Sequence, residues 1–133
     1  MEAAADRAAR QLELAADPDR GGRVYAGSLQ EAHVIMELVE AGELRGPVSR
    51  MAGRGDCTDR DGQDWDVKRP RDDVRHPAFE VSPFVERHIR WDVQASGENV
   101  IVDLTGLVDH ANRRALREAV SQAGLAAHVR WYE

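Results

Sequence analysis

The residues best suited to chemistry lie in residues 55–68, which read Gly-Asp-Cys-Thr-Asp-Arg-Asp-Gly-Gln-Asp-Trp-Asp-Val-Lys. Asp66 and Lys68 end an expected strand, where residues two apart point to the same face. Asp56 or Asp59, on the partner strand of a hairpin, is expected to lie opposite. Two carboxylates could bind Mg²⁺ or Mn²⁺ through oxygen ligands while the lysine orients or activates water. The pattern therefore predicts a metal-dependent phosphodiesterase site formed by Asp56, Asp66 and Lys68.

Neighbouring aspartates compete with Asp56 for the role of second carboxylate, namely Asp59, Asp61 and Asp64. Asp59 and Asp61 flank the turn of the hairpin, where aspartate side chains commonly accept nearby backbone N–H groups. We expect these two to serve the turn, which leaves Asp56 as the preferred partner of Asp66.

Arginines follow the proposed site directly. Arg69, Arg71 and Arg75 lie in an expected loop and could bind phosphate through bidentate hydrogen bonds. The alternative is a solvated loop in which Asp72 and Asp73 balance their charge.

Hydrophobic spacing and turn residues predict the elements that carry these side chains. The first half is expected to hold a helix over 3–16, a helix from the Ser28–Glu31 capping box to Gly42, an extended segment at 48–51, and a hairpin with its turn at 60–62. The second half is expected to hold a loop over 70–79, a helix capped by Ser82 with Pro83 in its first position and ending at 96–97, a strand at 100–104, a helix capped by Asp109, and a strand at 128–132. Strand, helix and strand in the last part predict a parallel βαβ unit. The fold class is therefore predicted as α/β (α+β), a single domain with a mixed sheet that combines an antiparallel hairpin with this unit, flanked by helices. Residues 1–27 are predicted to be a helical extension and 28–133 the main domain.

Composition limits the functional classes. The 133 residues carry a formal net charge of −6, which argues against nonspecific coating of nucleic acid. Cys57, the one cysteine, is expected to be a packed strand residue. A chain with one cysteine can form no internal disulfide, which suits a reducing compartment such as the cytoplasm. No apolar run is long enough for a membrane span, and the start of the chain lacks the features of a signal peptide. Trp65 is expected in the core, and Asp103 is expected to cap the next turn.

This pattern resembles the PD-(D/E)xK nuclease superfamily. Gly55-Asp56 stands where that family has Pro-Asp, and Asp66-Val67-Lys68 matches (D/E)-x-K. The family often adds an acidic residue from its first core helix. The resemblance implies that Glu37 is the preferred candidate for this third metal ligand, with Glu31 and Glu40 as alternatives.

A looser resemblance is to the C-terminal toxin domains of contact-dependent inhibition and related polymorphic systems, many of which cleave tRNA. It rests on the patterns D-G-x-x-W-D-V-K-x-P, G-E-N-V-I-V-D and the terminal V-R-W-Y. It implies that the substrate is RNA, tRNA in particular, rather than DNA, and that a cognate immunity protein binds the site.

Two other functions stay open. Some such toxins resemble the metal-independent ribonucleases of the barnase, EndoU, colicin and RelE fold, in which Lys68 and a histidine would carry acid–base catalysis. The histidine candidates are His76, His88 and His110. The third hypothesis is a non-catalytic α/β module whose acidic hairpin binds a basic protein partner.

Overall fold

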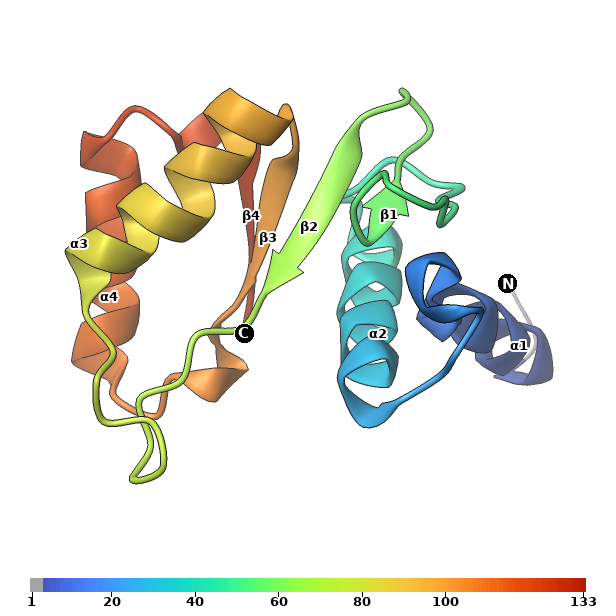
Figure 1. The fold of residues 1–133 in the computed structure, drawn as a ribbon, viewed down its shortest axis with the longest axis horizontal. Coiled ribbons are helices and arrows are strands. Elements are labelled where there is room, and N and C mark those ends of the chain that lie inside the picture. The colour runs from blue at the N-terminus through green and yellow to red at the C-terminus, as the bar shows by residue number, and fades with distance from the viewer. Residues whose placement is uncertain (1–3) are drawn as a thin grey trace. The chain divides into compact units, whose positions relative to one another are not determined.

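The computed structural model describes residues 4–133, in which strands follow the sheet order β1-β2-β3-β4 (Figure 1). β1 (Cys57–Thr58) pairs antiparallel with β2 (Asp64–Lys68), and β3 (Asn99–Asp103) runs parallel to β4 (Val129–Tyr132). The predicted α/β class, with an antiparallel hairpin and a parallel βαβ unit, is confirmed. Chain contacts divide the protein into two compact units, Met1–Trp65 and Asp66–Glu133. The expected division at residue 27 stays a prediction.

The first unit is built on two helices, α1 (Ala4–Ala15) and α2 (Ala26–Glu40). The predicted start of the second helix at Ser28 is wrong, because α2 begins two residues earlier. The Ser28 hydroxyl accepts the N–H of Tyr25 at 3.0 Å and donates to its carbonyl, also at 3.0 Å. The serine therefore satisfies backbone groups from inside the first turn rather than from the capping position.

The predicted extended segment at 48–51 is reduced to one bridge in which Ser49 pairs with Thr58. Gly53 and Gly55 follow it with φ of 72° and 73°, a left-handed conformation that favours glycine and turns the chain. The expectation of three strands before the third helix is therefore wrong, since the described residues form two there. The hairpin turn itself is as predicted, with Gly62 at φ 80°.

The second unit contains a helix that starts as α3 (Val81–Phe84) and continues through η2 (Val85–Arg90) and η3 (Asp92–Ser96). The later two segments have π-type hydrogen bonding, yet φ and ψ at Trp91 are −59° and −49°, close to α-helical values. The predicted capping by Ser82 is wrong, because the helix begins at Val81 and Glu80 precedes it without a side-chain cap.

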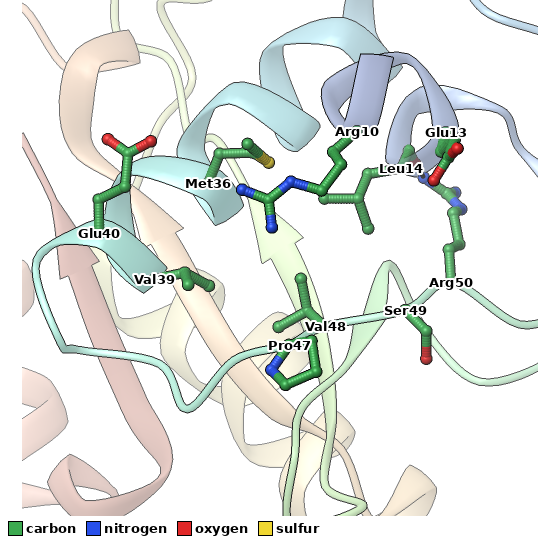
Figure 2. Close-up of a pocket in the computed structure, with 10 residues that line it drawn as sticks. All are labelled: Arg10, Glu13, Leu14, Met36, Val39, Glu40, Pro47, Val48, Ser49 and Arg50. Atoms are coloured by element: carbon green, nitrogen blue, oxygen red, sulfur yellow. Dashed lines mark hydrogen bonds between the residues drawn. The ribbon is translucent and has the colours of Figure 1, made fainter. Parts of the chain in front are cut away.

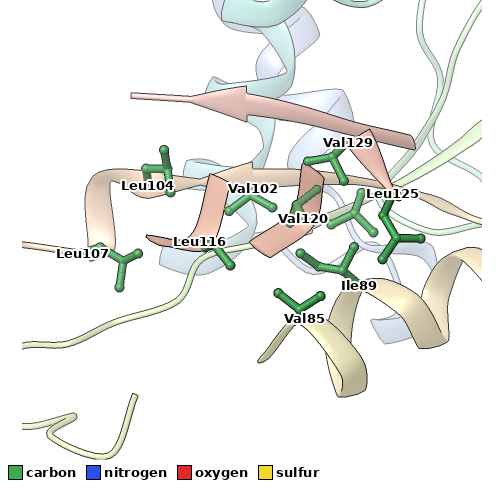
Figure 3. Packing of buried hydrophobic residues seen from close by; sticks show 10 residues of the cluster. Val85, Ile89, Val102, Leu104, Leu107, Leu116, Val120, Leu125 and Val129 are labelled. Carbon is green, nitrogen blue, oxygen red and sulfur yellow. The ribbon is translucent and has the colours of Figure 1, made fainter. Parts of the chain in front are cut away.

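α4 (His110–Gln122) packs with this helix on the same side of β3 and β4 (Figures 1 and 3). Its predicted cap is confirmed, since the Asp109 side chain accepts the N–H of Ala111 at 2.8 Å. The buried residues of the core between these elements are all aliphatic, and Phe79, Phe84 and Trp131 pack against it. It consists of Val85, Ile89, Val100, Val102, Leu104, Leu107, Leu116, Val120, Leu125 and Val129.

Candidate acidic site in the second unit

β2 brings Asp66 and Lys68 together as the two-residue spacing predicts. The Lys68 Nζ lies 2.7 Å from Asp66 Oδ2 and 3.4 Å from Asp92 Oδ2. Glu98 completes the group, because one carboxylate oxygen from each of Asp66, Asp92 and Glu98 lies within 4.8 Å of the others. Three carboxylates and one ammonium group therefore converge within the second unit.

The end of the long helix positions Asp92 and Glu98. Asp92 lies seven residues after Val85 and three after Ile89, so at α-helical pitch it shares their buried face. Gly97, at φ 69°, ends the helix in a left-handed conformation. The Glu98 N–H then donates to the Asp92 carbonyl at 2.9 Å, which holds the two residues at the same end of the helix.

Asp92 is a buried acid, with 7% of the residue exposed. Burial raises its pKa to about 6, a hydrogen bond with Asp66 adds to the rise, and Lys68 opposes it. Its Oδ2 has no hydrogen-bond partner among the described residues, even though Lys68 Nζ stands at an ion-pair distance. This oxygen is left in position to accept a further ligand.

The lysine and a nearby histidine titrate in opposite directions. Burial alone would lower the pKa of Lys68, but Asp66 and Asp92 outweigh it, so the pKa is raised and the ammonium stays charged. Desolvation lowers the pKa of His88, and the charges of Lys68 and Arg87 lower it further. His88 is exposed, and its ring lies 5.2 Å from that of Phe84.

The other predicted metal ligands lie in the first unit. Asp56 Oδ1 is 3.3 Å from Nη2 of Arg50, a side chain that is 6% exposed. Glu37 is 3.5 Å from His33 along α2. Both carboxylates therefore have cationic or ionisable partners in their own unit, and their roles as metal ligands stay predictions.

The competing aspartates serve the hairpin. Asp59 accepts the backbone N–H groups of Asp61 and Gln63 at 2.9 and 3.0 Å, and its other oxygen accepts the indole N–H of Trp65 at 2.9 Å. Asp64 accepts the hydroxyl of Thr58 at 2.8 Å. Asp59 is thus a turn residue, as predicted.

Two packing predictions for the hairpin are also confirmed. Trp65 is 2% exposed, which agrees with its predicted place in the core. Burial raises the pKa of the Cys57 thiol to about 12, which agrees with a packed residue rather than a nucleophile.

The predicted arginines follow β2 in a loop that is fixed to the segment after β3. Arg69 Nε lies 3.5 Å from the buried Asp103, which also accepts the N–H of Thr105 at 2.9 Å and so has its predicted capping role. Arg71 Cγ would lie 3.3 Å from a Cβ placed on Gly106. The Arg75 N–H donates to the side chain of Asp73 at 3.0 Å. Phosphate binding by these arginines stays a prediction.

Sequence reasoning missed Asp92 and Glu98. Asp92 carries a detectable signal, because it stands at a position of the helix where the apolar spacing of Val85 and Ile89 requires a buried residue. Glu98 lies in a turn, and no local pattern marks it.

A cavity of about 290 Å³ lies within the first unit (Figure 2). Its lining residues are Arg10, Glu13, Leu14, Met36, Val39, Glu40, Pro47, Val48, Ser49 and Arg50. Arg7 pairs with Glu40 at 2.6 Å, and Arg50 pairs with Asp17 at 3.5 Å. The wall therefore combines apolar side chains with charged ones, of which Glu40 and Arg50 are ion-paired.

The chain matches no family model, no curated protein and no solved structure. The fold itself places the protein in the α/β class. Because no relative points to a function, the case for one rests on the acidic group of the second unit. Among residues 4–133, no helix combines the length and the apolar character needed to cross a membrane.

Proposed function

We propose that the second unit carries a metal-dependent phosphodiesterase site, in which Asp66, Asp92 and Glu98 bind a divalent cation beside Lys68. The observation that carries this proposal is the convergence of three carboxylate oxygens within 4.8 Å of one another. The buried Asp92 Oδ2, which has no hydrogen-bond partner among the described residues, points to a ligand at the same place. This group takes Asp92 and Glu98, rather than Asp56 and Glu37, as the carboxylates that act with Asp66.

The spacing of the oxygens is compatible with a hard cation. Two ligands on opposite sides of an ion are separated by twice the metal–oxygen distance, about 4.2 Å for Mg²⁺ and about 5 Å for Ca²⁺. The group spans no more than 4.8 Å between ligand atoms. An upper limit of this order is compatible with either cation.

Lys68 is the residue with a distinct chemical role. A bound cation would neutralise developing charge on a scissile phosphate. Lys68, now 2.7 Å from Asp66, would turn its ammonium group towards the phosphate or the attacking water once the cation takes over the carboxylates. In the acidic group without an ion, Asp66 and Asp92 raise the pKa of Lys68 and so keep it a charged ammonium group.

The resemblances supply the finer parts of the proposal. They suggest an endonuclease that acts on RNA, tRNA in particular, as a bacterial toxin domain working in the cytoplasm, with an immunity protein that covers the site. Arg69, Arg71 and Arg75 would bind the phosphate backbone in such a complex.

Calorimetric titration with Mg²⁺, Mn²⁺ and Ca²⁺ tests the cation site directly. Asp92→Asn should weaken binding at least tenfold, and Glu118→Gln, an exposed carboxylate on α4, should leave it unchanged. Lys68→Ala should tighten binding, because it removes the positive charge that competes for Asp66 and Asp92. Equal affinity in the wild type and Asp92→Asn would contradict the site.

Cleavage of total tRNA, other RNA and plasmid DNA then tests the activity, with Mg²⁺ or Mn²⁺ and with EDTA. The proposal predicts metal-dependent cleavage that is lost in Asp66→Ala and in Lys68→Ala. Loss of activity in Lys68→Ala together with tighter cation binding would separate the lysine's chemical role from a structural one. No cleavage of any substrate would favour the non-catalytic binding module.

One observation favours a second candidate, the metal-independent ribonuclease. His88 has a lowered pKa and so is neutral at pH 7, whereas Lys68 stays charged, which is the pairing that a general base and a general acid require. RNA cleavage that persists in EDTA and is lost in His88→Ala would support this alternative. Loss of RNA cleavage in EDTA would exclude the metal-independent ribonuclease.

A further inference from the structure

An aromatic face on the long helix of the second unit has no part in the acidic group. Phe84, His88 and Trp91 are spaced by four and three residues, which places them on one side of a helix at α-helical pitch. Trp91 is 63% exposed. Only 5% of the chain is aromatic, so an exposed tryptophan is a large share of its aromatic surface and needs an explanation.

A cavity of about 340 Å³ opens at the start of this face. Phe79, Phe84, Arg87 and His88 are among the residues that line it. The rings of Phe79 and Phe84 lie 5.8 Å apart, so the wall is formed by packed aromatic groups. A volume of this order is at the lower end of the range for small-molecule pockets and suits a flat ring more than a folded protein segment.

Charged side chains of both signs lie beside these rings. Arg87 is exposed, and within residues 4–133 it forms no ion pair. Desolvation lowers the pKa of His88, and the charges of Lys68 and Arg87 lower it further, which favours the neutral imidazole as a stacking ring. Glu80 also lines the cavity, so the face is mixed in charge and depends on Arg87 for attraction to an anion.

We propose that Phe84, Arg87, His88 and Trp91 bind single-stranded nucleic acid, with nucleobases stacked on the rings and a phosphate held by Arg87. This inference rests on the proposed function, for which it names the substrate class as a single strand rather than a duplex. Stacking on aromatic side chains requires bases with free faces, and every base has one, so binding tolerates differences in sequence. Asp92 follows Trp91 directly in the chain, so the aromatic face and the acidic group share one helix.

Quenching of tryptophan fluorescence measures this binding without any catalysis. The protein is titrated in EDTA with a 12-nucleotide oligouridine, its DNA counterpart and a duplex of the same length. Trp65 is 2% exposed, and Trp131 is half-buried with the Arg117 guanidinium 5.2 Å from its ring, so quenching that is lost in Trp91→Phe identifies the signal of Trp91. We expect saturable quenching by both single strands, weaker binding of the duplex, and affinity that falls as salt rises.

Variants identify the surface by anisotropy with a labelled oligouridine. Trp91→Ala should weaken binding about tenfold, and Trp91→Phe should restore most of the affinity because it restores a stacking ring. Arg87→Ala should also weaken binding and flatten the salt dependence. The matched control is Arg114→Ala, an exposed arginine on α4, which should bind as the wild type does.

The outcomes separate this inference from the proposed function. Failure of the folded protein to bind any single strand, or equal affinity in Trp91→Ala and the wild type, would overturn the stacking surface. Cation binding at the acidic group together with such a result would leave the phosphodiesterase proposal standing. Binding lost only in the aromatic and Arg87 variants, with no cation bound, would instead support the surface and contradict the metal site.

Discussion

Replacing Asp92 with asparagine should remove a specific pH dependence of stability. Burial first, and then the hydrogen bond with Asp66, raise the pKa of Asp92 from 3.8 to about 6 in the folded protein. The folded state then binds this proton more tightly than the unfolded state does. The resulting stabilisation is fully present below about pH 4 and is lost as the pH rises through about 6.

The size of the effect follows from the shift. The pKa rises by about 2 units, and one unit corresponds to about 1.4 kcal/mol, which gives about 3 kcal/mol between acidic and neutral pH. Solvent screening reduces this value little, because Asp92 is 7% exposed. Asparagine has nearly the same shape and does not ionise. We therefore expect the stability of Asp92→Asn relative to the wild type to increase by up to this amount from pH 4 to pH 7.

The assay is urea unfolding followed by circular dichroism at half-unit steps from pH 4 to pH 7.5, in EDTA. Glu80→Gln is the control, since Glu80 is an exposed carboxylate of the same unit without a side-chain cap bond. The difference in unfolding free energy between Asp92→Asn and the wild type should grow with pH, while that of the control stays flat. A constant difference for Asp92→Asn would refute the assignment of a buried, partly protonated acid at this position.

Two further predictions concern residues that hold loops in place. Asp59→Ala should lower the free energy of unfolding in urea by about 2–3 kcal/mol, because it removes the acceptor of the buried Trp65 indole N–H. Asp61→Ala is the control and should change the free energy of unfolding by less than about 0.5 kcal/mol. Gly106→Ala should cost on the order of 1–3 kcal/mol, since its Cβ would stand 2.3 Å from the Pro70 carbonyl oxygen. A melting temperature equal to that of the wild type would contradict this close approach.

Local patterns located most of the elements but misplaced some of their ends. Asp109 and Gly62 have the predicted roles, because a helix cap and a tight turn depend on their own few residues. Ser28 and Ser82 were assigned to capping positions that lie inside the helices. The start of each helix is set by the last extended residue before it. The position of that residue depends on how the preceding chain packs as well as on which residue can cap the helix.

The residues of the candidate site also divide into those that a local pattern predicts and those that it does not. Asp66 and Lys68 were predictable, because a strand places residues two apart on one face. Asp92 and Glu98 join them from a helix end and a turn, so their proximity exists only once β2, the long helix and β3 have packed. Charged residues at core-facing helix positions are the signal to look for, since such a position otherwise takes an apolar side chain.

The ion pair with Lys68 does not by itself account for Asp92. Lys68 is already paired with Asp66 at 2.7 Å, whereas Asp92 Oδ2 lies farther away, at 3.4 Å. An apolar side chain at position 92 would continue the buried face of Val85 and Ile89 and would avoid the desolvation of a carboxylate. Asp92 is a buried acid that lowers stability at neutral pH, and its Oδ2 has no hydrogen-bond partner among the described residues, which is the reason for proposing a ligand that it shares with Asp66. A divalent cation would supply the charge that one lysine divides between Asp66 and Asp92.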